Sequence, residues 1–240
     1  MGSRKHFVGF FLFSFLFVAY SNGANLIANP GFETPESTSG SWPGSFGDWN
    51  GDSSAIVGTT YGIVPAEGSK MLQFVGTGLS SSGGADSCQV LQLINVSSYQ
   101  TLISAGKAKA ILSASFNRVA GDSQIDTKYN LSVMGYNGSA STFPSRWNTY
   151  GFSGALGVKH AGDYYLDALT STWETISVEY TLPVGTTFIA IQICMSEDVY
   201  NDYNLPEFDG HFVDAVSLEI IPEPTTMLLF GAGLMLFRKR

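Results

Sequence analysis

A regular alternation of apolar and polar residues is the feature that most restricts what this chain can fold into. Between Lys107 and Arg118 every second residue is apolar, and residues 129–133 and 176–182 repeat the pattern. A period of two is that of a half-buried β-strand, because successive side chains of a strand point to opposite faces of its sheet. Residues 188–195 read as apolar on both faces, as expected of a central strand. The body of the chain is therefore predicted to consist of strands.

Segments rich in Gly and Ser separate these strands, and no segment has a helical period over a convincing length. With the further strands expected at 56–57, 71–75, 88–96 and 212–220, the chain has roughly eight to ten strands at the spacing of an all-β domain. The fold is predicted to be all-β: a single antiparallel β-sandwich (jelly roll) over residues 25–221. Residues 143–172 are too long and too aromatic for a tight turn, and we expect them to form an elaborated loop or added hairpin.

The N-terminus reads as a secretory signal peptide, residues 1–24. Arg4 and Lys5 precede a nearly unbroken apolar run, residues 7–19, and small or polar residues follow it. This order of basic, apolar and small-residue regions is recognised by the Sec translocation machinery and by signal peptidase. A signal helix is thus expected in front of the sandwich.

The C-terminus combines a Pro222–Glu223–Pro224 motif, thirteen uncharged residues, and the basic cluster Arg238, Lys239 and Arg240. As a helix the uncharged stretch would span about 20 Å, against a hydrocarbon core of about 30 Å. It is short for a permanent membrane anchor, although the basic cluster favours a cytoplasmic C-terminus. A short apolar helix that anchors the chain transiently in the inner membrane is therefore expected.

These three elements in this order resemble the PEP-CTERM sorting signal. The resemblance covers the last twenty residues, with residues 222–240 as the sorting segment, and the apolar stretch is shorter than is usual in this family. The resemblance implies an exosortase-type transpeptidase as partner, processing near Pro-Glu-Pro, and delivery to the cell surface or extracellular matrix of a bacterium that makes exopolysaccharide.

Net charge excludes some partners. Five of the twelve basic residues and one acid, Glu223, lie outside residues 25–221, which keep 19 acids and 7 bases and a net charge of −12. A nucleic-acid partner is excluded by this charge, and a disordered chain by the 13% aromatic content. An acidic body favours neutral glycans or cations such as calcium.

The body also resembles the galactose-binding-like jelly roll of many carbohydrate-binding modules. The resemblance rests on the opening residues 25–33, Asn-Leu-Ile-Ala-Asn-Pro-Gly-Phe-Glu, and on the closing residues 212–218, Phe-Val-Asp-Ala-Val-Ser-Leu. It implies a structural calcium ion held by Glu33 and Asp214, with backbone carbonyls completing the shell. The alternative is that Asp214 accepts a hydrogen bond from a backbone amide or pairs with Lys70.

Exposed aromatic side chains beside hydroxyl-binding groups are the candidates for sugar binding. One pair is Trp147 and Tyr150, beside Arg146 and Asn148, and a second is Tyr200 and Tyr203. A third group is Trp42 with Phe46, whereas Trp49 and Trp173 are assigned to the core. The alternative is that these aromatics close the ends of the sandwich.

Cys88 and Cys194 are the only two cysteines, and both lie in predicted strands of an exported protein. Disulfides persist outside the cytoplasm, so a Cys88–Cys194 bridge is expected, with two buried free thiols as the alternative.

Catalytic motifs are missing from the body. It has two histidines, no HExxH and no GxSxG, and its acidic residues 197–209 crowd into one predicted loop instead of facing one another as a glycosidase requires. The sequence predicts an exported, non-catalytic surface or matrix protein that binds a neutral polysaccharide. The alternatives are a structural surface protein that makes protein–protein contacts and, less favoured, a secreted glycoside hydrolase.

Overall fold

The computed structural model describes residues 23–75, 87–119, 127–167, 169–197 and 210–223. The predicted signal helix and the predicted C-terminal apolar helix lie outside these residues, as do Tyr200 and Tyr203. Among the residues that are described, no helix has the length and apolar character needed to cross a membrane.

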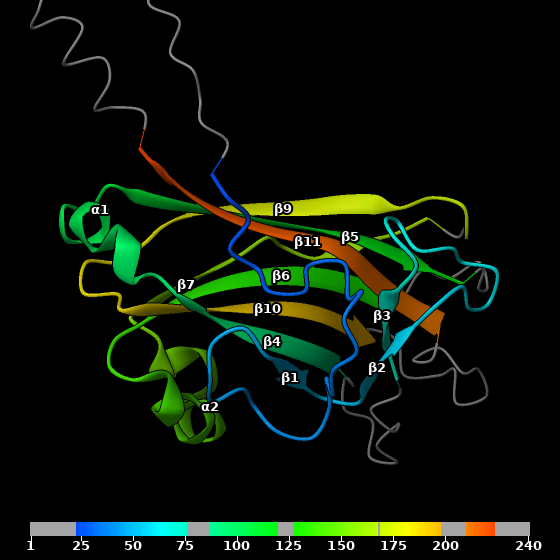
Figure 1. Cartoon of the computed structure of the whole chain (residues 1–240), viewed down its shortest axis with the longest axis horizontal. Helices are drawn as coiled ribbons and strands as arrows, with labels where there is room; N and C mark the ends of the chain where they lie inside the picture. Colours follow the sequence, from blue (N-terminus) through cyan, green and yellow to red (C-terminus); the bar gives the residue numbers. More distant parts are fainter. Residues whose placement is uncertain (1–22, 76–86, 120–126, 168, 198–209, 224–240) are drawn as a thin grey trace, which may run out of the picture.

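Two antiparallel sheets pack face to face (Figure 1). The six-stranded sheet has the order β1-β4-β10-β6-β7, with β8 also paired to β6, and the five-stranded sheet has the order β2-β3-β11-β5-β9. The all-β sandwich prediction is confirmed. The strands are β1 Trp49–Gly51, β2 Ser54–Val57, β3 Met71–Phe74, β4 Ser87–Asn95, β5 Ala108–Arg118, β6 Thr127–Tyr136, β7 Gly157–His160, β8 Tyr164–Tyr165, β9 Glu174–Thr181, β10 Phe188–Glu197 and β11 His211–Pro222.

The core lies between the sheets and follows the alternation in the sequence. Every second residue of β5 from Ala108 to Phe116 is buried in it, as are Ile189, Ile191, Ile193 and Met195 of β10. The other face of β10 is divided: Phe188 and Ala190 belong to a second apolar cluster on the outside of the six-stranded sheet. Strand β10 is thus apolar on both faces over only part of its length.

The second cluster exists because the helical first part of residues 143–172 folds back over the outer face of this sheet, while the strands that follow extend the sheet. Residues 143–172 form helix α2 (Phe143–Tyr150), a 3₁₀ turn at Gly151–Gly154, and the short strands β7 and β8. Phe143 and Trp147, one helical turn apart, face the sheet and pack with Phe188 and Ala190. The expected loop or hairpin therefore contains a helix that was not predicted, besides the shorter α1 (Gln100–Ser104) after β4.

Both ends of the described body lie side by side at one end of the sandwich (Figure 1). The backbone N–H of Leu26 donates to the carbonyl of Leu218 in β11, and the N–H of Val216 donates to that of Pro30. A Cβ atom built on Gly23 would lie 3.5 Å from the Cβ atom of Glu219. The N-terminal segment thus runs antiparallel to the last strand.

The predicted Cys88–Cys194 disulfide is wrong, because both cysteines are free and buried. Strands β4 and β10 are neighbours, but Cys194 stands opposite Gln89 and Cys88 opposite Met195. This offset of one residue turns the two side chains to opposite faces of the sheet. Cys88 lies in the core, whereas Cys194 lies on the outer face.

Candidate binding cleft

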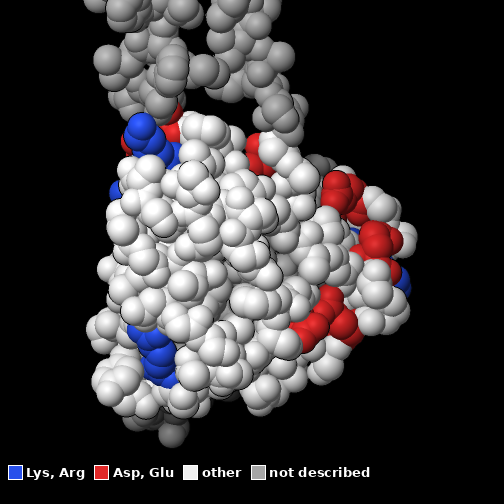
Figure 2. Space-filling model, turned by 60° about the vertical axis from the view of Figure 1, so that its left-hand side comes forward, with Lys and Arg blue, Asp and Glu red and all other residues white. Residues whose placement is uncertain are grey.

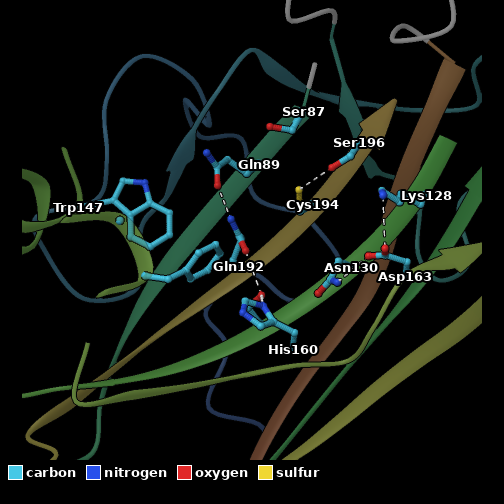
Figure 3. Close-up of a pocket in the computed structure, with 13 residues that line it drawn as sticks. Ser87, Gln89, Lys128, Asn130, Trp147, His160, Asp163, Gln192, Cys194 and Ser196 are labelled. Carbon is cyan, nitrogen blue, oxygen red and sulfur yellow. Dashed lines mark hydrogen bonds and ion pairs between the residues drawn. The ribbon is translucent and has the colours of Figure 1, made fainter. Parts of the chain in front are cut away.

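A cleft of about 500 Å³ lies on the outer face of the six-stranded sheet, beside α2 (Figure 3). Strands β4, β10 and β6 form its floor, the segment after α2 forms one wall, and β7 with the turn into β8 forms its far side. Its lining residues are Ser87, Gln89, Lys128, Asn130, Ser132, Trp147, Gly151, Phe152, His160, Asp163, Gln192, Cys194 and Ser196.

The floor carries a chain of hydrogen-bonded side chains that crosses four strands (Figure 3). Gln192 donates through Nε2 to Gln89 Oε1 and accepts at Oε1 from the Ser132 hydroxyl, at 3.0 Å. Ser132 Oγ is also 2.8 Å from His160 Nδ1. The serine hydroxyl has one proton, which it uses in the hydrogen bond to Gln192, so His160 Nδ1 must be the donor in its contact with Ser132. In this tautomer of the uncharged imidazole the other ring nitrogen, Nε2, is an acceptor, and Gln89 keeps its amide N–H groups as donors.

Asn130 contributes an acceptor that the protein leaves unused. Its Nδ2 donates to the carbonyl of Gly162 at 2.8 Å, which fixes the orientation of the amide. Its Oδ1 is buried and has no hydrogen-bond partner among the described residues. A buried acceptor without a partner costs free energy, and since its surface is closed to solvent, a ligand hydroxyl would reach it only if the side chains around it moved.

Aromatic rings form the wall opposite this polar floor. Phe152 packs edge-to-face against His160, with ring centroids 4.7 Å apart, and against Trp147 at 5.1 Å. Phe152 is 38% exposed, whereas Trp147 is 7% exposed. The accessible apolar surface of the wall is therefore that of Phe152, with Trp147 supporting it from behind.

Formal charge in the cleft is balanced. Within the described part of the chain, the only Lys, Arg, Asp or Glu residues in its lining are Lys128 and Asp163, which form an ion pair at 3.3 Å. Figure 2 shows the end of the molecule that carries α1 and α2, and most of this surface is uncharged. The acidic side chains visible in this view gather mainly on its right-hand side. A neutral, polar ligand matches a cleft of this kind better than an ion does.

The structure places the predicted sugar-binding aromatics differently. Trp147 lines the cleft, but one face of its ring stacks on Phe143 and its edge meets Trp42. Tyr150 is 61% exposed at the end of α2 and is not part of the cleft lining. Its neighbour Asn148 accepts a hydrogen bond from the Trp42 indole N–H at 2.7 Å. Trp49 is fully buried, as expected of a core residue.

Glu33 and Asp214 both bind the surface loop of residues 66–70, but each accepts hydrogen bonds from different backbone N–H groups. Glu33 accepts from the backbone N–H groups of Ser69 and Lys70, which lower the pKa of its carboxyl group. Asp214 is completely buried, and its two oxygens accept from the N–H groups of Glu67 and Ala215. Burial raises the pKa of Asp214 to about 6.

This arrangement supplies few of the six to eight oxygens that calcium requires, because both carboxylates are already bonded to backbone donors. No group of three or more His, Cys, Asp or Glu residues gathers at a possible metal site within the described part of the chain. The backbone-amide alternative for Asp214 is present in the structure. Calcium binding at Glu33 and Asp214 stays a prediction.

Sequence reasoning missed the polar side chains of the cleft floor. Gln89, Asn130, Ser132 and Gln192 all occupy outward positions of central strands that are otherwise apolar. That was a usable signal, since a polar residue repeated at one face of a central strand needs partners. His160 could not be found in the same way, because β7 is short and lies in the unexpected insertion.

Comparison with known families identifies the C-terminal segment. The family model described as the PEP-CTERM protein-sorting motif matches residues 221–240. The resemblance expected from Pro222–Glu223–Pro224 and the terminal basic residues is confirmed, and this motif indicates an exported, cell-surface-directed protein. No curated protein sequence matches the chain.

Several solved structures are similar in outline. The CBM22-1 xylan-binding domain of Paenibacillus barcinonensis Xyn10C is 10% identical, with a TM-score of 0.46, over 83% of this chain and 96% of that domain. A family 16 carbohydrate-binding module is 14% identical, with a TM-score of 0.41, over 81% and 99% of the two chains. The active domain of bacteriophage CBA120 tailspike protein 4 is 11% identical, with a TM-score of 0.45, over 82% of this chain, which spans only 21% of that domain.

Proposed function

We propose that this chain is an exported, non-catalytic protein that binds a neutral polysaccharide in the cleft on its six-stranded sheet. The observation that carries the proposal is a cleft of about 500 Å³ in which a floor of amides and hydroxyls lies beside the exposed ring of Phe152. Polysaccharide hydroxyls can donate to His160 Nε2 and can accept from the Gln89 amide. The apolar faces of the sugar rings would lie against Phe152.

A non-catalytic role is supported by the carboxylates of the cleft. Hydrolysis of a glycosidic bond generally requires two carboxyl groups that flank it. Among the described residues of the cleft lining, Asp163 is the only Asp or Glu, and it is paired with Lys128. The described cleft therefore offers a binding surface without the acid–base pair of a glycosidase.

Export completes the proposal. Residues 1–24 would direct the chain to Sec and be removed by signal peptidase. The sorting motif would anchor the chain transiently in the inner membrane until an exosortase-type enzyme processes it and delivers the body to the surface or matrix. Terminal masses of the exported protein test this route, and an exported form that keeps Arg240 would contradict it.

Binding to a glycan array, followed by titration with the best neutral polysaccharide, tests the cleft. Phe152→Ala and Gln89→Leu should each weaken binding about tenfold or more, equivalent to about 1.4 kcal/mol. Tyr150→Ala is the matched control, because Tyr150 is an exposed aromatic residue two positions from Phe152 but outside the lining. Equal losses of affinity for Phe152→Ala and Tyr150→Ala would contradict the assignment of the cleft as the binding site. A folded protein that binds no polysaccharide would favour the protein–protein alternative.

A further inference from the structure

The sorting motif begins inside the folded sandwich. Strand β11 continues to Pro222, the first residue of the Pro-Glu-Pro motif, and Pro222 stands opposite Ala108 at the start of β5. The backbone N–H of Glu223 then donates to the carbonyl of Lys107 at 3.0 Å. The first two residues of the motif are therefore a continuation of the sheet, with no linker between the body and the motif.

The side chain of Glu223 is bound to the body as well. Its Oε1 accepts a hydrogen bond from the hydroxyl of Thr181, the last residue of β9. The central residue of the motif is thus bonded through its backbone to the residue before β5, and through its carboxylate to β9. Both contacts use groups that a second protein would need in order to recognise this residue.

An enzyme that binds an extended peptide reads it through backbone hydrogen bonds and through pockets for its side chains. The docked end of β11 cannot offer these groups, because the N–H and the carboxylate of Glu223 already have partners. Recognition of the motif by its processing enzyme and docking of the motif on the sandwich therefore exclude each other.

Release of this end is easier than release of the rest of the strand. Strand β3 pairs with β11 only from His211 to Val213, and the N-terminal segment bonds to β11 at Val216 and Leu218. Among the described residues, Ile221 and Pro222 therefore have a ladder partner on the β5 side only. Ile221 is half-buried and Pro222 is exposed, in contrast to the buried first half of the strand. Strand ends with few buried contacts open at the lowest free-energy cost.

We propose that the sandwich controls the processing of its own sorting motif: residues 221–223 must detach from β5 and β9 before the processing enzyme can bind Pro-Glu-Pro. The processing rate then scales with the small fraction of molecules in which this strand end is open. The control depends on the C-terminal motif and is independent of the polysaccharide cleft.

The test is a pulse-label measurement of processing in a bacterium that processes Pro-Glu-Pro proteins, with loss of the C-terminal residues followed by intact mass. Insertion of Gly-Ser-Gly-Ser between Ile221 and Pro222 moves the complete motif away from the sheet and should raise the rate at least fivefold. Thr181→Val removes one hydrogen bond with little change of shape and should raise the rate roughly two- to fivefold. Thr175→Val is the matched control, since Thr175 lies in the same strand but bonds to Ser115 at the other end.

Equal rates for the wild type and the insertion variant would overturn the proposal, and so would a slower rate for the insertion variant, which would mean that the docked strand is the recognised form. Hydrogen exchange gives a second measurement on the full chain in detergent. The Glu223 amide should exchange at least tenfold faster than that of Val213, and Thr181→Val should accelerate Glu223 alone. If Thr181→Val left the exchange rate of the Glu223 amide unchanged, the hydrogen bond between Thr181 and Glu223 would not hold the end of β11 in place, which would contradict the proposal.

Discussion

The guanidinium group of Arg146 lies over the ring of Tyr136, with its central carbon 5.1 Å from the ring centroid. The same side chain donates to the carbonyl of Asn137 at 2.8 Å and to that of Gly154 at 2.6 Å. Arg146 therefore joins the chain just after β6, at Asn137, to the 3₁₀ turn that carries Phe152, although it does not line the cleft.

Replacement of Arg146 by Ala should reduce both stability and ligand affinity. The loss of a cation–π contact and of charge-assisted hydrogen bonds should lower the free energy of unfolding by about 1–3 kcal/mol. Affinity should fall because the wall that carries Phe152 loses its support. Urea unfolding and polysaccharide titration measure the two effects. Arg146→Lys is the control: it keeps the charge but not the planar fork, so it should recover only part of each loss. Full recovery would show that charge alone matters.

The two thiols should react only after unfolding. Burial raises the pKa of both Cys88 and Cys194, that of Cys194 to about 12, and the thiolate is the reactive form. Native protein treated with iodoacetamide at pH 7.5 should keep its mass. In guanidinium without reductant it should gain two carbamidomethyl groups, as detected by intact mass. A protein that gains none in guanidinium would contain the disulfide after all.

Asp214 should make stability fall as pH rises from about 4 to about 6. Its folded pKa of about 6 lies above the unfolded value, so in this window the folded state holds a proton that the unfolded state has released. Between pH 4 and pH 7 in calcium-free buffer, the free energy of unfolding of the wild type should fall by about 2–3 kcal/mol relative to that of Asp214→Asn. Urea unfolding of both proteins measures this difference, in which other titrating groups cancel. Parallel pH profiles would contradict it.

Calcium should act on the same carboxylate if the site predicted from Glu33 and Asp214 forms. A bound cation would offset the cost of the buried charge, so millimolar calcium at pH 7 should raise the melting temperature above that in EGTA. Asp214→Asn and Glu33→Gln should each abolish the rise. If calcium leaves the wild type unchanged, the two carboxylates serve only to bind the backbone of residues 66–70.

Alternation along the chain was enough to predict the sandwich, because a half-buried strand must place its apolar residues on one face. The same rule could not predict the pairing register, and the disulfide failed on a register offset of one residue between β4 and β10. The cleft was missed for a related reason. Aromatic content drew attention to Trp147, whereas the insertion buries most of that ring and leaves the exposed Phe152 and a row of amides to line the cleft.

The antiparallel contact between the N-terminal segment and β11 has a mechanical consequence. The N-terminal segment and the end of β11 lie at the same end of the sandwich (Figure 1), and the bonds between Leu26 and Leu218 and between Pro30 and Val216 follow one another along the pair. Tension between the two ends would load these bonds one at a time, as in unzipping, and would not shear them together. The body should therefore yield to a low pulling force, and it should begin to open at the edge where its sorting motif starts.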